Sequence, residues 1–112
     1  MIALRLRFLT GRYHATPWGR HVNEAAVAWP PEPSRILRAL IACHYRKADV
    51  DVFSEDDLAD LIDVLAEELP IYRLPEAVHA HTRHYMPSPI KTTLVFDAFA
   101  RFDPEEPLIV GW

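Results

Sequence analysis

The stretch TTLVFDAFARFDPEEPLIVGW, residues 92–112, decides the class of fold. Residues 92–102 are rich in β-branched and aromatic side chains, which is typical of a strand. The acids and prolines of residues 103–107 predict a turn, and residues 108–112 begin a second apolar strand. We expect this second strand to pair back on the first, so that both belong to one antiparallel sheet.

Residues 2–9, IALRLRFL, predict another strand at the other end of the sequence. Apolar side chains recur at every second position there, which gives a strand one apolar face. Arg5 and Arg7 share the opposite face. That side of the sheet is therefore expected to be cationic or exposed to solvent.

Two helices are predicted between these strands. The first opens at Pro33, with Ser34 as the expected N-cap and an apolar stripe that runs from Ile36 to His44. The second opens at Ser54 with a capping-box pattern, followed by an acidic outer face and an inward apolar face that ends at Leu69.

Glycines and prolines interrupt any regular pattern in residues 10–33, and we also interpret residues 71–91 as irregular. The expected order is then strand, helix, helix, strand, strand. This is an α+β fold that supplies an incomplete ferredoxin-like (RRM-like) unit with an antiparallel sheet. We expect residues 1–112 to form a single N-terminal module and to be a fragment of a longer protein.

Charge is distributed unevenly along the chain, whose net charge is −4. Residues 1–47 hold eight Arg and Lys against two Glu, whereas residues 48–112 hold four Arg and Lys against fourteen acids. Such asymmetry suggests a local surface for an anionic ligand. The single cysteine, Cys43, allows no internal disulfide and is expected in the core. No apolar run is long enough to span a membrane, so a cytoplasmic location is expected.

The first cluster of candidate site residues lies in GRYHATPWGRHVNEAAVAWPPEPSRILRAL, residues 11–40. Arginines bind phosphate oxygens in pairs of hydrogen bonds, and aromatic rings stack on unpaired bases. Taken singly, each of these residues is more often a solvated cation or a ring at the edge of the core. Together they predict contact with an anionic, flat ligand through Arg12, Tyr13, His14, Trp18, Arg20, His21, Asn23, Arg35 and Arg38.

The second cluster is HAHTRHY, residues 79–85. Three histidines within six residues allow two functional interpretations. They supply imidazoles for a zinc ion. Alternatively, a histidine removes the proton of a ribose 2′-hydroxyl while an arginine stabilises charge on the phosphodiester, a cleavage that needs no metal. A third, purely structural interpretation is that the histidines only form hydrogen bonds to the backbone of a loop.

The three segments GRYHATPWGRHVNEAAVAWPPEPSRILRAL, LPEAVHAHTRHYMP and TTLVFDAF resemble, in this order, the N-terminal part of a known family. It is the fused RAMP-superfamily subunit that handles RNA in CRISPR effector complexes of subtype I-G, formerly I-U. The resemblance covers nearly the whole chain. It implies an RNA-binding subunit that recognises repeat-derived guide RNA, with processing of the precursor RNA as a second activity of the full-length protein.

The resemblance also implies site residues and partners. Tyr85 joins His81 and His84 as catalytic candidates, and Arg83 joins the RNA-binding residues of the first cluster. No metal or other cofactor is expected. The expected partners are CRISPR repeat or guide RNA and other subunits of an effector complex, with no membrane. The alternative function, from another class, is a small zinc-binding or protein-interaction module without RNA activity.

Overall fold

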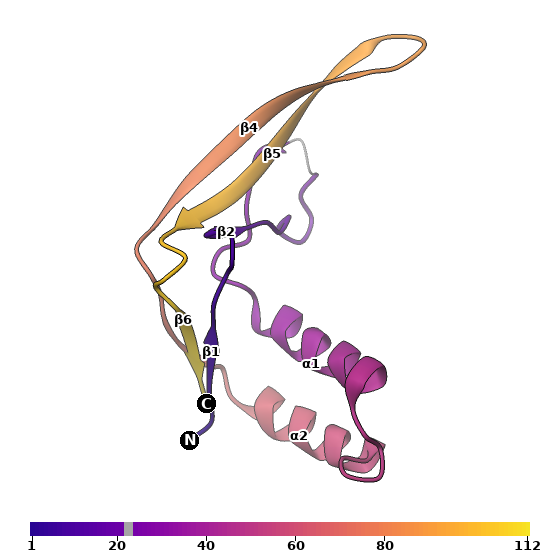
Figure 1. Ribbon diagram of the computed structural model, residues 1–112, viewed down its shortest axis with the longest axis vertical. Helices are drawn as coiled ribbons and strands as arrows, with labels where there is room; N and C mark the ends of the chain where they lie inside the picture. The colour runs from indigo at the N-terminus through magenta and orange to yellow at the C-terminus, as the bar shows by residue number, and fades with distance from the viewer. Residues whose placement is uncertain (22–23) are drawn as a thin grey trace.

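The computed structural model describes residues 1–21 and 24–112, which form two helices and two three-stranded antiparallel sheets (Figure 1). In chain order the elements are β1 (Ala3–Leu6), β2 (Arg12–Tyr13), α1 (Pro33–Lys47), α2 (Glu55–Glu67), β3 (Ile71–Arg73), β4 (Ala77–Pro87), β5 (Thr92–Phe102) and β6 (Leu108–Gly111). The α+β class is confirmed. The incomplete ferredoxin-like order with a single sheet is not confirmed, because the strands divide into sheet A (β1-β6-β3) and sheet B (β2-β5-β4).

Strand β6 is the centre of sheet A. It pairs with β1 on one side and with β3 on the other, so the expected pairing of residues 108–112 with residues 92–102 is wrong. The reason lies in sheet B, where both edges of β5 are occupied near its end. Arg101 stands opposite Arg12 of β2 on one edge and opposite Val78 of β4 on the other. The last strand therefore finds its partners in a second sheet.

The core lies between the inner face of sheet A and helix α1. Leu108 and Val110 of β6 are fully buried, and Ile36 of α1 packs against them. Leu4 and Leu6 of β1 stand opposite these two residues of β6 and join the same cluster. The alternation expected for the first strand is therefore confirmed. Removing this apolar surface from water is the main force that holds the helix on the sheet.

Helix α1 begins at Pro33 as expected, but its N-cap lies two residues earlier than Ser34. Its N-cap is Glu32, whose side chain makes no capping hydrogen bond, so the assignment of Ser34 as the cap is wrong. Pro33 suits the first turn because a proline lacks the N–H that would have no partner there. The apolar stripe is confirmed and reaches His44, which is 7% exposed. Cys43 is exposed, contrary to expectation, because neighbouring residues of a helix point about 100° apart.

Helix α2 has the expected capping box. The Ser54 backbone N–H and hydroxyl both donate to Oδ2 of Asp57 at 2.8 Å, and the Asp57 N–H donates back to Ser54 Oγ at 3.2 Å. These bonds, the one from the Ser54 N–H first, lower the pKa of the Asp57 carboxyl. The helix ends at Glu67, so Leu69 lies beyond it and is exposed rather than part of the inward face.

Strands β4 and β5 form a long hairpin. Eleven residues pair on each side, from Ala77 opposite Phe102 to Pro87 opposite Thr92. The hairpin curves away from the helices and gives the molecule its 52 Å longest axis (Figure 1). The interpretation of residues 71–91 as irregular is therefore wrong. Polar side chains occupy both faces of β4, so the apolar alternation that marks a half-buried strand is missing there.

An aromatic cluster joins the hairpin to sheet A. Phe102, the last residue of β5, stacks on Trp29 with ring centroids 4.9 Å apart and meets Phe8 edge to face at 5.1 Å. Tyr13 of β2 contacts Phe8 and Trp29 at 5.6 and 5.7 Å. Burial in this cluster raises the pKa of the Tyr13 hydroxyl. Gly11 turns the chain here, with its carbonyl accepting from the Phe102 N–H at 2.9 Å.

Across residues 1–21 and 24–112, no helix combines the length and the apolar character needed to cross a membrane.

The capping box makes a pH-dependent prediction. Because the folded state lowers the pKa of Asp57, its contribution to stability is present above the ordinary aspartate pKa of about 3.9 and is lost as the pH falls through the folded-state pKa. Asp57→Asn should therefore lower the urea midpoint at neutral pH, and the difference from the parent should shrink in acid. Asp60→Asn, on the same helix but outside the cap, is the control. A difference that is constant with pH would contradict the assignment.

Two glycines make a matched stability test. Gly11 and Gly19 both have positive φ angles, of 64° and 80°. A Cβ at Gly11 would lie 2.5 Å from the Phe102 carbonyl oxygen, whereas one at Gly19 would meet nothing within 4 Å. Gly19→Ala should cost roughly 1–2 kcal/mol through its backbone conformation alone. Gly11→Ala should cost clearly more in the same urea titration, and equal losses would show that the close contact at Gly11 does not matter.

Candidate nucleic-acid interface

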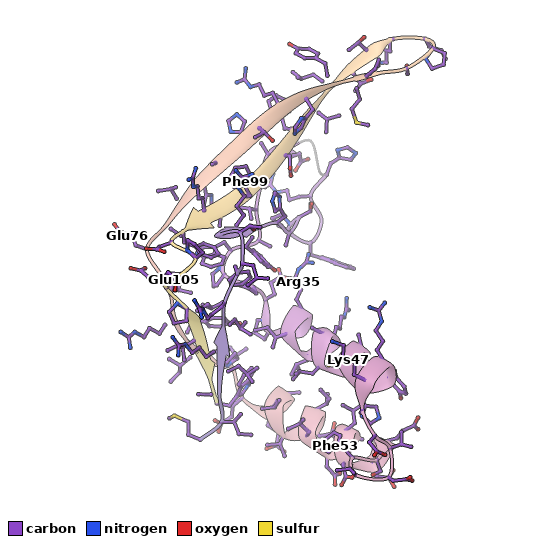
Figure 2. The ribbon with its side chains drawn as sticks, viewed as in Figure 1. Arg35, Lys47, Phe53, Glu76, Phe99 and Glu105 are labelled. Atoms are coloured by element: carbon purple, nitrogen blue, oxygen red, sulfur yellow. The ribbon has the colours of Figure 1, made fainter. Side chains whose placement is uncertain are left out.

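Residues 77–96, which comprise β4, the turn and the start of β5, contain no Asp or Glu, and we call this segment the arm. The exposed carboxylate of Asp97 follows directly and stands opposite Thr82 of β4. The basic and titratable cationic side chains of this segment are His79, His81, Arg83, His84 and Lys91, and all five are exposed. Figure 2 shows Glu76 where the chain enters the arm and Glu105 on the turn after β5, so these acids lie at the base.

One face of the arm combines cations with an aromatic ring. Arg83 stands directly opposite Phe96, and its guanidinium lies 5.5 Å from the centroid of that ring. The His81 ring lies 5.9 Å from the same ring. Tyr85 follows on the same face, two residues beyond Arg83, and its side chain is 73% exposed. This face offers positive charge and flat surfaces to a ligand.

The opposite face of the arm carries His84. Its Nε2 lies 2.9 Å from the Thr82 hydroxyl, two residues back along the same strand. Because side chains alternate along a strand, the structure does not bring the three catalytic candidates together: His81 and Tyr85 share one face and His84 lies on the other. His79 also lies with His81. Within the described part of the chain no three His, Cys, Asp or Glu are arranged to hold a metal ion.

The base of the arm receives the start of the opening loop. The Arg12 guanidinium lies 4.7 Å from the centroid of the Phe99 ring, which Figure 2 labels where the arm meets β2. His14 contacts the same ring at 5.3 Å, and its Nδ1 lies 3.1 Å from an Asp97 carboxylate oxygen. Tyr13 points the other way, into the aromatic cluster. The loop thus adds Arg12 and His14 to the face of sheet B that carries His84, opposite to the face of Arg83.

Two arginines face each other at this base. Arg12 and Arg101 are cross-strand partners, and both are exposed. Like charges directly opposite one another on a sheet are destabilising. The part of the chain that the structure describes shows no carboxylate paired with either guanidinium. This pair is a second place where the surface favours an anion.

Three of the remaining residues of the first cluster lie beside the start of α1. Trp18, Arg35 and Arg38 border a groove of about 750 Å³, together with Glu32, Ser34 and Ala39. Arg20 forms an ion pair with Glu24 at 3.3 Å. His21 is exposed, and Asn23 lies outside the described residues. Of the sequence-predicted set, Arg12, His14 and Arg83 therefore lie on the arm or at its base, and Trp18, Arg35 and Arg38 border the groove.

Sequence reasoning missed Phe96, Phe99 and Arg101. The two phenylalanines support Arg83, His81, Arg12 and His14 from the neighbouring strand, and Arg101 completes the arginine pair. The sequence FDAFAR, residues 96–101, predicts that all three lie on a strand, but it does not predict which strands pair with it. The register of β5 with β4 identifies Phe96, and the register of β5 with β2, which joins residues far apart in the chain, identifies Phe99 and Arg101.

In comparisons with known proteins, the chain matches no protein-family model, no curated protein and no solved structure.

Proposed function

We propose that this chain is an RNA-binding subunit and that the arm is its main contact with RNA. The observation that supports this most directly is the absence of any acid between Glu76 and Asp97, on a hairpin that projects from the body. A polyanion approaching the face of the arm that carries Arg83 meets cations and no carboxylate from either strand, whereas the His84 face carries the exposed carboxylate of Asp97. The exposed ring of Tyr85 beside these cations suits an unpaired base, since such bases stack on aromatic side chains.

The identity of the RNA comes from the resemblance described above. On that basis the ligand is repeat-derived guide RNA, and the partners are other subunits of a CRISPR effector complex of subtype I-G in the cytoplasm. We assign binding, not cleavage, to this stretch. A general base and a general acid must reach one phosphodiester, and His81 and His84 lie on opposite faces of β4. Processing of the precursor is then an activity of the full-length protein.

The first test is the salt dependence of RNA binding. Arg83→Ala should weaken binding of a labelled CRISPR-repeat RNA roughly tenfold, because a charge-assisted contact to phosphate is lost, and should reduce the slope of log affinity against log salt by about 1. Fluorescence anisotropy at several salt concentrations measures both quantities. Arg46→Ala, in the last turn of α1, is the matched control. Equal effects of the two variants, or no preference over a scrambled RNA, would contradict the proposal.

The arginine pair gives a second test, in which stability and binding should change in opposite directions. Arg101→Gln removes the repulsion from Arg12 and should raise the free energy of unfolding by roughly 0.2–1 kcal/mol. The same change should weaken RNA binding. Urea unfolding and anisotropy on the same preparation provide the two measurements. An Arg101→Gln protein that is less stable, or that binds RNA as well as the parent, would show that the pair does not serve an anion.

A further inference from the structure

Trp18 is an unusually exposed aromatic residue. Its side chain is 88% exposed, although tryptophan is among the side chains that gain most from burial. It lies in the turn that precedes Gly19, where the Arg20 N–H donates to the Pro17 carbonyl oxygen at 3.1 Å. The other two tryptophans, Trp29 and Trp112, pack against the core. Trp18 therefore leaves most of its ring surface open for contact.

The turn that carries Trp18 is fastened to α1. Nη2 of Arg35 donates to the Thr16 carbonyl oxygen at 2.7 Å, and its Nε lies 3.6 Å from the Glu32 carboxylate. Figure 2 shows Arg35 at the first turn of the helix, on the side toward the loop. Its charge is therefore already engaged within the protein. Arg35 and Glu32 together hold one wall of the groove in place.

Arg38 is placed differently on the same helix. It is exposed and borders the groove one turn further on, facing the same hollow as Trp18. The described residues provide no ion pair for it. The groove thus presents one exposed ring and one guanidinium available to an anion. Its volume of about 750 Å³ lies within the range of small-ligand sites.

We propose that this groove holds a single unpaired nucleotide of the bound RNA, with the base stacked on Trp18 and its phosphate bound by Arg38. The inference rests on the proposed function and adds that the RNA is single-stranded where it passes α1. In a duplex both faces of each base are covered by its neighbours, so Trp18 could not stack on one. Glu32 also borders the groove, and its carboxylate disfavours a second phosphate beside the first.

The experiment uses the full chain and the emission of Trp18. A short single-stranded RNA should quench the emission, and the same sequence in a fully paired duplex should not. The contribution of Trp18 is obtained by subtracting the titration of Trp18→Phe, which keeps a ring and should bind nearly as well as the parent. Trp18→Ala and Arg38→Ala should each weaken binding of the single strand by roughly tenfold. Arg46→Ala, also on α1, is the control and should bind like the parent.

The outcomes separate this inference from the proposed function. If the parent and Trp18→Ala bind the single strand equally well, the nucleotide site is wrong, although RNA binding by the arm stands. Quenching of Trp18 by the duplex as strongly as by the single strand also overturns the site. If the parent binds no RNA, both proposals fail. Because Trp18 and Arg38 are exposed, circular dichroism should show that every variant is folded.

Discussion

The aromatic cluster of Phe102, Phe8, Trp29 and Tyr13 holds the two parts of this molecule together. Sheet A and α1 share a core of their own around Leu108 and Val110, but the hairpin has no second layer over most of its length. Isolated two-stranded hairpins are marginal in water. The arm therefore depends on its base, where four rings from separate segments meet and bury the end of β5.

Acidic and basic side chains are concentrated on different parts of the molecule. Helix α2 carries acids on its exposed face, and α1 carries only basic charges, with the two helices packed beside each other. The arm and the opening loop continue the basic character of α1 on the far side of the aromatic cluster. An anionic polymer approaching the molecule is therefore attracted to one side and repelled by α2. The charge distribution would thus direct the proposed RNA ligand, although the net charge of the chain is negative.

Elements whose apolar residues repeat with a clear period could be predicted from the sequence. The first strand, both helices and the strand over residues 92–102 were found in this way, and the capping box at Ser54 was found from its side chains. Strand β4 could not be found, because hydrogen bonds to β5 stabilise it without a buried face. The candidate site was likewise predictable only where the local sequence carries the signal. The cationic stretch around Arg83 is visible in the sequence, whereas the contact of Arg83 with the Phe96 ring depends on how β4 pairs with β5.

Strand β4 lies at the edge of sheet B, and no strand in the described part of the chain pairs with its outer side. An open edge of this length presents a row of backbone donors and acceptors to any other strand, and edge-to-edge association is a route to aggregation. The cations of the arm oppose this, because two copies brought together edge to edge would repel each other. The side chains proposed to bind an anionic ligand therefore also oppose edge-to-edge association of two copies, so neutralising them together would favour this association.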